Sequence, residues 1–189
     1  MVIILDKKEF AEAVQSVARF AQRTSASLPV LSGIAIIAGD DGIKLRATNL
    51  ETGIDLSLAG TIKEPGVVAL PAAVLREITA SLSGSGPLTL EQSGSTVSVQ
   101  SGTGKSTLKT LPYEDFPVLP LPESPKVSFS LPGAVLRSLI SAVAGYASTS
   151  TVRPELASVL LKAEGGTLTA VATDSFRLAE KKITLSGTV

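Results

Sequence analysis

The sequence repeats itself at a separation of 125 residues, and this repeat constrains the fold more than any other feature. One shift, without a gap, aligns a helical segment, a loop proline and an alternating, strand-like segment. The aligned pairs are 47–49 with 172–174, Ile43 with Leu168, Pro29 with Pro154, Leu31 with Leu156, Phe10 with Val135 and Val14 with Leu139. We therefore interpret the chain as one module followed by a second copy. The second copy begins near residue 126 and reaches only its middle by residue 189, so we expect it to be truncated.

Within the first module, the hydrophobic pattern predicts a strand, a helix and three strands, twice in succession. The first helix follows Asp6, a residue type that caps helix N-termini, and the second helix follows Pro71. Residues 28–31 should be extended, because the residue before Pro29 avoids the helical region. Alternation predicts strands at 2–5, 33–38, 43–50, 53–59, 67–70, 88–92, 96–101 and 106–111. The pattern predicts an α+β fold with an internal near two-fold.

A proline-rich segment separates the two modules. Residues 112–125 contain five of the eleven prolines, which favours an extended connection. We expect a complete domain over 1–120, a linker over 121–125 and a truncated domain over 126–189. The elements expected in the truncated domain are a strand at 127–131, a helix that opens at Pro132, and strands at 156–163, 167–173 and 178–185.

Composition narrows the classes of function. Lys and Arg total 17 and balance 17 Asp and Glu, so the chain lacks the overall positive charge of many nucleic-acid-binding proteins. Histidine and cysteine are both absent, which removes the commonest general base, the thiolate nucleophile and the commonest metal ligand. We therefore predict a non-enzyme without a cofactor or metal. Apolar runs are too short for a membrane span or a signal-peptide core, so we expect a cytoplasmic protein.

One motif suggests nucleotide binding. Residues 102–107, GTGKST, resemble the end of a phosphate-binding loop. The full motif requires a glycine where Val99 stands and a helix after the loop, whereas the following residues alternate as a strand. We therefore predict a hairpin turn at Gly102. Asp174, a candidate for acid–base chemistry, follows a strand and precedes Ser175, so its carboxylate should accept hydrogen bonds from backbone N–H groups in a turn.

A second cluster of residues favours peptide binding. Arg153 and Leu156 precede one expected strand, and Phe176, Arg177 and Leu178 follow its neighbour, so the two segments can meet at one end of a sheet. Two guanidinium groups beside Leu and Phe would frame an apolar pocket with a polar rim, which suits an extended peptide. The residues alone leave an alternative equally open, in which Phe176 belongs to the core and both arginines are solvated.

Five motifs together resemble those of one family. They are LPVLSGI at 28–34, ATNLETGI at 47–54, TLPYEDFP at 110–117, RPEL at 153–156 and ATDSFRLA at 172–179. In sequence and order they are similar to motifs of the bacterial sliding clamp, the beta subunit of DNA polymerase III. The resemblance implies the DNA-clamp fold, in which repeated β-α-β-β-β units place helices on one face of antiparallel sheets.

The resemblance also implies a DNA polymerase processivity factor. Such a clamp is a ring-shaped homodimer around double-stranded DNA, associated with the nucleoid in the cytoplasm. It binds the DNA polymerase III catalytic subunit and the clamp loader through their clamp-binding peptides, and it makes no contact with a membrane. An alternative with the same fold is a truncated, clamp-like adaptor that binds peptides without encircling DNA.

Three sets of site residues follow from the resemblance. The partner peptide would bind Arg153, Leu156, Thr173, Ser175, Phe176, Arg177 and Leu178. DNA would contact Arg19 on the polar face of the first helix, together with Arg23, Arg137 and Ser150. The subunit interface would include Arg76, Leu82, Lys105, Ser106 and Leu108. No residue is expected to be catalytic or to bind a metal.

Overall fold

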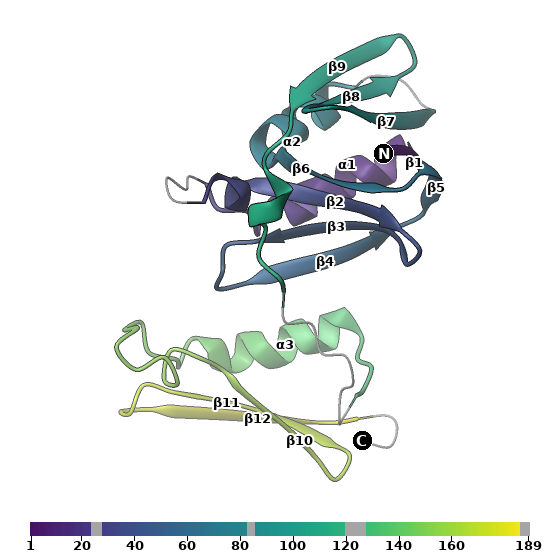
Figure 1. Ribbon diagram of the computed structural model, residues 1–189. Helices are drawn as coiled ribbons and strands as arrows, with labels where there is room; N and C mark the ends of the chain where they lie inside the picture. Colours follow the sequence, from purple (N-terminus) through teal and green to yellow (C-terminus); the bar gives the residue numbers. More distant parts are fainter. Residues whose placement is uncertain (24–27, 83–85, 120–127, 186–189) are drawn as a thin grey trace. The chain divides into compact units, whose positions relative to one another are not determined.

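The computed structural model describes residues 1–23, 28–82, 86–119 and 128–185 (Figure 1). The chain divides into two compact units, unit 1 (Met1–Pro120) and unit 2 (Leu121–Val189). The predicted linker at 121–125 lies outside the described residues. None of the described helices is long and apolar enough to cross a membrane.

Unit 1 consists of two successive half-modules of the same design, each a strand, a helix and three strands. The first half-module contains β1 (Val2–Asp6), α1 (Lys7–Val17), β2 (Gly33–Gly39), β3 (Gly42–Thr48) and β4 (Gly53–Leu58). The second half-module contains β6 (Gly66–Pro71), α2 (Ala72–Ser81), β7 (Pro87–Ser93), β8 (Thr96–Ser101) and β9 (Gly104–Lys109). The remaining elements are η1 (Pro29–Ser32), η2 (Tyr113–Asp115) and β5 (Gly60–Glu64), a strand that the sequence pattern did not predict.

The two half-modules exchange their first strands. β1 pairs with β7 and β6 pairs with β2, which gives sheets of order β5-β1-β7-β8-β9 and β4-β3-β2-β6. Both exchanged pairings are antiparallel and share one register. The corresponding pairs are Leu5–Leu88 and Ile3–Leu90 in the first sheet, and Leu70–Ile34 and Val68–Ile36 in the second. Unit 1 is therefore built around an internal near two-fold, as the repeat predicts.

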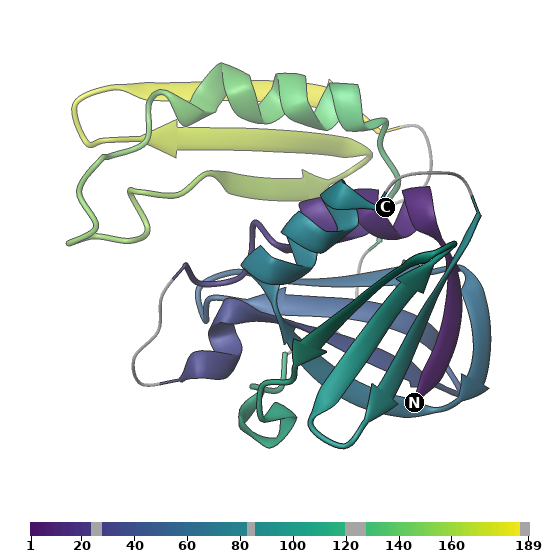
Figure 2. The same cartoon turned by 90° about the horizontal axis from the view of Figure 1, so that it is seen from above.

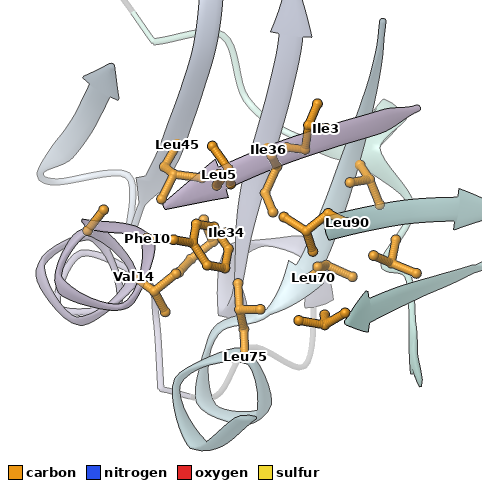
Figure 3. Close-up of a cluster of buried hydrophobic side chains, with 14 of the residues drawn as sticks. Ile3, Leu5, Phe10, Val14, Ile34, Ile36, Leu45, Leu70, Leu75 and Leu90 are labelled. Atoms are coloured by element: carbon orange, nitrogen blue, oxygen red, sulfur yellow. The ribbon is translucent and has the colours of Figure 1, made fainter. Parts of the chain in front are cut away.

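The core of unit 1 joins both sheets and both helices in one cluster. Phe10 from α1, Leu75 from α2, and Ile36 and Leu90 from the two sheets are all fully buried (Figure 3). α1 and α2 lie side by side over this core (Figure 2). Burying each such side chain contributes about 1.5–3 kcal/mol to folding. Because both half-modules supply these side chains, neither buries its apolar face without the other.

Unit 2 contains a single half-module among its described residues. Its elements are α3 (Gly133–Ala144), β10 (Leu160–Glu164), β11 (Thr167–Thr173) and β12 (Leu178–Thr184), and the sheet order is β10-β11-β12. β11 has the bounds that the sequence predicts, and its inward-facing Leu168, Ala170 and Ala172 are buried. They form a small core with Leu139 and Val143 of α3.

The gapless repeat is wrong at the helices, although α1 begins where predicted. The Asp6 carboxylate caps α1 by accepting hydrogen bonds from the backbone N–H groups of Lys8 and Glu9, each at 2.9 Å. The gapless alignment places Leu131 opposite Asp6, but the N-cap residue of α3 is Pro132, one position later. Helix α1 also ends at Val17, which leaves Arg19 in the turn after the helix rather than on its polar face.

The extended conformation predicted for residues 28–31 is also wrong. Leu28 is outside the helical region, with φ −135° and ψ 83°, as the following proline requires. Pro29 then begins the 3-10 helix η1, where its fixed φ suits the first turn. The hydroxyl of Ser32 closes this turn by donating to the Pro29 carbonyl at 2.7 Å. The proline therefore restricts the residue before it and starts a helical turn after it.

Two predicted strands of unit 2 differ from the structure. Residues 128–131 are not in a strand: their counterpart β1 pairs with β7, whereas they pair with no strand among the described residues. β10 begins at Leu160 rather than at residue 156. The preceding residues form a turn in which the N–H groups of Leu156 and Ala157 donate to the Arg153 carbonyl at 3.0 and 3.3 Å.

Candidate functional site

The turn between β11 and β12 is held by a cage of side-chain hydrogen bonds. Thr173 Oγ1 donates to the Arg177 carbonyl at 2.7 Å and accepts from the Ser175 N–H at 3.1 Å. Asp174 Oδ1 accepts from the N–H groups of Phe176 and Arg177 at 3.0 and 2.9 Å, which confirms the predicted role of this carboxylate. Ser175 has a positive φ of 77°, which places it in the left-handed region. The turn therefore holds a strained backbone in one conformation.

The same cage occurs in unit 1, between β3 and β4. Thr48 Oγ1 donates to the Thr52 carbonyl at 2.8 Å and accepts from the Leu50 N–H at 3.0 Å. Asn49 Oδ1 accepts from the N–H groups of Glu51 and Thr52 at 3.1 and 2.8 Å. Leu50 has a positive φ of 73°. The duplication therefore extends to individual hydrogen bonds, although the exposed side chains of the two turns differ.

Three contacts fix the guanidinium of Arg177. Its Nε donates to Asp174 Oδ2 at 2.8 Å, and its Nη2 donates to the Gly145 carbonyl at 3.0 Å. Its guanidinium carbon also lies 5.2 Å from the ring centroid of Tyr146, a cation–π arrangement. The hydrogen bond from Arg177, followed by those from the backbone N–H groups, lowers the pKa of Asp174 below its ordinary value. The carboxylate thus stays ionised and holds Arg177 in place.

The side chains next to Arg177 are exposed to solvent. Phe176 is 97% exposed and Leu178 is 63% exposed, so the alternative that Phe176 belongs to the core is wrong. Leu156 is partly buried, and its carbonyl accepts a hydrogen bond from the Ser148 N–H at 2.8 Å. The loop after α3 thus contacts Leu156 through Ser148 and Arg177 through Gly145.

The cluster predicted for peptide binding therefore gathers around one loop of unit 2. Arg153, exposed in the turn that contains Leu156, lies beside the same loop. Sequence reasoning missed Tyr146, which lies under the Arg177 guanidinium. Only the position of this aromatic residue, directly after a helix, could have indicated its role.

A groove of about 570 Å³ lies in unit 1, where the segment after α1 meets the start of α2. Arg19, Arg23 and Arg76 line this groove together with small and neutral residues, and no Asp or Glu lines it. No ion pair is formed by these three arginines within the part of the chain that the structure describes. The groove is therefore a concentrated positive site in a chain whose charges balance overall. Arg76, which the sequence assigned to a subunit interface, lies here beside two arginines predicted to contact DNA.

The remaining predicted residues lie on separate surfaces. Arg137 is exposed on α3, and Ser150 lies in the loop before β10, where its hydroxyl accepts from the Val152 N–H at 3.4 Å. Lys105 and Ser106 lie on β9, the edge strand of the larger sheet of unit 1. On the same strand Leu108 is buried in the core, and Leu82, after α2, packs against that core.

The turn at Gly102 and the acidic residues were the candidates for nucleotide and metal binding. Gly102 has a positive φ of 58° and lies in the turn between β8 and β9, which confirms the predicted hairpin in place of a phosphate-binding loop. Across the described ranges, no group of three or more acidic residues is arranged to hold a metal ion. The arrangement instead offers a cationic groove in unit 1 and an exposed apolar and cationic turn in unit 2.

Two domain descriptions of one protein subunit match the chain. The family description "DNA polymerase III beta subunit, N-terminal domain" matches residues 1–120, and the description of the central domain of the same subunit matches residues 130–188. The beta sliding clamp of Streptomyces coelicolor is 30% identical over 96% of this chain and 47% of its own length. That of Pseudomonas aeruginosa is 32% identical over 95% of this chain and 48% of its own length. The chain spans about half the length of the curated relatives it matches.

Solved structures agree with these sequence matches. The DNA polymerase sliding clamp of Bacillus subtilis superposes with a TM-score of 0.87 at 29% identity, over 100% of this chain and 51% of that one. The DNA polymerase III subunit beta of Pseudomonas aeruginosa gives a TM-score of 0.84 at 30% identity, again over 100% and 51%. These similarities confirm the DNA-clamp fold. The chain therefore belongs to the family of the DNA polymerase III beta subunit, the bacterial sliding clamp.

Proposed function

We propose that the chain functions as part of a DNA polymerase processivity factor, a clamp that encircles duplex DNA and tethers the replicative polymerase. The observation that carries this proposal is the groove between α1 and α2, in which three arginines meet without a carboxylate. Membership in the sliding clamp family supports it. The proposed role requires binding and no chemistry, so we place the protein among non-catalytic accessory subunits.

The groove suits the phosphates of duplex DNA. DNA affinity comes largely from cations that displace condensed counterions, and each phosphate contact adds to the dependence on salt. Arg19, Arg23 and Arg76 offer three such cations, and long exposed side chains contact phosphates without reading the bases. A chain of zero net charge would hold DNA only locally at this groove, which suits a protein that slides. We assign Arg76 to this DNA-facing set rather than to the subunit interface.

The turn at 173–178 suits a partner peptide. Phe176 and Leu178 present apolar surface to solvent, while Asp174, Gly145 and Tyr146 hold the Arg177 guanidinium beside them. Exposed aromatic and arginine side chains on a rigid backbone are typical anchors of protein interfaces. We propose that clamp-binding peptides of the DNA polymerase III catalytic subunit and of the clamp loader bind here, with Arg153 and Leu156 on the neighbouring turn.

The assembly and the cellular location follow from the same proposal. In a ring-shaped homodimer, the edge strand β9 with Lys105 and Ser106 would meet the partner chain, supported by Leu82 and Leu108 behind it. Arg137 on α3 and Ser150 in the following loop would add DNA contacts from unit 2. Such a ring would act on the nucleoid in the cytoplasm.

A second candidate is a peptide-binding adaptor that does not encircle DNA. It is favoured by the turn at 173–178, whose Arg177 is held entirely by contacts within unit 2, from Asp174, Gly145 and Tyr146. An adaptor would keep the turn at 173–178 and would not need the arginine groove. Duplex DNA binding therefore separates the two candidates.

The test is a pair of fluorescence titrations, one with a clamp-binding peptide and one with duplex DNA, on two variants. Phe176→Ala should weaken peptide binding about tenfold or more, because an exposed aromatic anchor is lost, and should leave DNA binding unchanged. Arg23→Ser should weaken DNA binding most at low salt and should spare the peptide. Leu160→Ala and Lys63→Ser, exposed positions outside both surfaces, are the matched controls.

Each titration has an outcome that contradicts part of the proposal. If Phe176→Ala binds the peptide as the native chain does, the peptide site is wrong even though the family stands. If the native chain binds the peptide but not duplex DNA at low salt, the adaptor replaces the clamp.

A further inference from the structure

The acidic residue in the turn of unit 2 has one oxygen more than the equivalent turn of unit 1 uses. In unit 1, Asn49 Oδ1 alone accepts the backbone N–H groups of Glu51 and Thr52. In unit 2, Asp174 Oδ1 has the same role, so the cage does not need the second carboxylate oxygen, Oδ2. Arg177 Nε donates to Oδ2 at 2.8 Å. The repeat therefore separates the atom of Asp174 that builds the turn from the atom that holds Arg177.

The arginine that this oxygen holds has no cationic counterpart in unit 1. Thr52 occupies the equivalent position, 125 residues earlier, and its hydroxyl donates into its own cage, to Asn49 Oδ1 at 3.1 Å. Arg177 instead reaches the loop after α3, where its Nη2 donates to the Gly145 carbonyl at 3.0 Å and its guanidinium carbon lies 5.2 Å from the ring centroid of Tyr146. The two turns thus share a backbone design, and the unit 2 turn adds a fixed cation.

These contacts leave one edge of the Arg177 guanidinium free. A guanidinium has five N–H groups, and here the Nε–H and one N–H of Nη2 are engaged. The remaining N–H groups, on Nη1 and Nη2, have no partner among the described residues, and the side chain is 58% exposed. A side chain that is already ordered loses less conformational entropy when it binds a ligand. Arg177 is therefore prepared to donate hydrogen bonds to an oxygen acceptor that approaches from solvent.

We propose that Tyr146 and Asp174 are positioning residues of the partner-peptide site, Tyr146 through its ring and Asp174 through Oδ2. On the proposed peptide site, on which this assignment rests, they direct the free edge of Arg177 toward an oxygen acceptor of the peptide. Phe176 and Leu178 on the same turn then contact an apolar side chain of that peptide. The direction of Arg177 is set by the loop after α3 as well as by the turn itself.

The first test is a fluorescence titration of the 189-residue chain with a labelled clamp-binding peptide of the DNA polymerase III catalytic subunit. Tyr146→Leu removes the ring and keeps apolar bulk. Asp174→Asn copies the unit 1 residue, so the cage stays while the acceptor for Arg177 is lost. Each variant should bind the peptide about two- to fivefold more weakly, the range for an exposed cation–π contact or ion pair. Tyr146→Phe keeps the ring and should bind as the native chain does, and Asn49→Asp, the reverse exchange in unit 1, is the matched control.

A double-mutant cycle shows whether the two residues act through Arg177. In an Arg177→Ala background no guanidinium remains to be positioned, so Tyr146→Leu and Asp174→Asn should cause no further loss of peptide affinity. A residue that contacts the peptide directly, or that only maintains the fold, would cost the same in both backgrounds.

The second test measures the order of Arg177 without a peptide. In the native chain the side-chain Nε–H of Arg177 is hydrogen-bonded to Asp174, so its NMR signal should exchange slowly with water. Tyr146→Leu and Asp174→Asn should each make this exchange several times faster, whereas Tyr146→Phe should not. The backbone amides of Phe176 and Arg177 should stay protected in Asp174→Asn, because an asparagine oxygen completes the same cage in unit 1.

The outcomes separate this assignment from the peptide site on which it rests. If the native chain binds the peptide and both Tyr146→Leu and Asp174→Asn bind it equally well, or if their Arg177 Nε–H exchanges as slowly as in the native chain, the positioning role is wrong. Equal losses in the native and Arg177→Ala backgrounds also overturn it. A native chain that binds no peptide contradicts the proposed peptide site itself, and the positioning role falls with it.

Discussion

Removing the phenyl ring of Phe10 should destabilise unit 1 far more than the equivalent truncation destabilises unit 2. Phe10 is fully buried between both half-modules, and Phe→Ala at such a position costs about 3–5 kcal/mol through lost transfer free energy and a residual cavity. With α3 shifted by one residue relative to the gapless alignment, its repeat counterpart is Leu136, which is 37% exposed. Truncating a partly exposed side chain leaves little cavity, so Leu136→Ala should cost about 1 kcal/mol.

The two tyrosines allow each unit to be followed separately. Tyr113 belongs to unit 1 and Tyr146 to unit 2, and the chain has no tryptophan, so replacing one tyrosine with phenylalanine leaves a fluorescent reporter in the other unit. Urea unfolding would be measured for each truncation in both single-tyrosine variants. With a urea dependence of about 1–3 kcal/mol per M, Phe10→Ala should lower the midpoint of unit 1 by about 2 M. A loss below about 1 kcal/mol at Phe10, or equal losses at both positions, would refute the contrast between a complete module and a half-module.

Two further predictions concern the turns. The hydrogen bond from Arg177 lowers the pKa of Asp174 below its ordinary value of 3.8. The ionised carboxylate therefore stabilises the turn fully above pH 3.8 and loses this contribution as the pH falls through the lowered pKa. The amide NMR signals of Phe176 and Arg177 should therefore shift together only below pH 3.8, and a midpoint above it would contradict the hydrogen-bond assignment. Because Gly102 lies in a hairpin and no helix follows it, calorimetric titration with ATP and magnesium should detect no micromolar site; stoichiometric binding would show that the hairpin assignment misses a nucleotide site.

The repeat and the hydrophobic periodicity within it made most of the fold predictable, because the periodicity of a strand or helix depends only on the local order of residues. Segment 167–173 alternates strictly and forms β11 with the expected bounds. Asp6 was recognisable as a helix cap because its role is local. Segment 128–131 alternates as well, yet it forms no strand, because a strand needs a partner and its partner is non-local. β5 was missed for the related reason that its pairing with β1 is not encoded in the segment itself.

The candidate sites were predictable only in part. The carboxylate of Asp174 and the turn around it follow from a local sequence pattern. The arginine groove does not, because α1 and the start of α2 meet only after strand exchange brings the two half-modules together. Arg76 therefore gave no sign in the sequence that it would lie beside Arg19 and Arg23. Tyr146 was missed for the same reason, since its contact with Arg177 spans the sheet and the loop after α3.

The salt dependence of duplex DNA binding tests the central claim most directly. The measurement compares the native chain with a triple variant in which Arg19, Arg23 and Arg76 are all replaced by serine. Each phosphate contact contributes about 0.9 to the slope of log affinity against log salt, so the triple variant should have a slope shallower by about 2.7 and a much lower affinity at low salt. An unchanged slope and affinity in the triple variant would show that the groove does not hold DNA and would contradict the assignment of this surface.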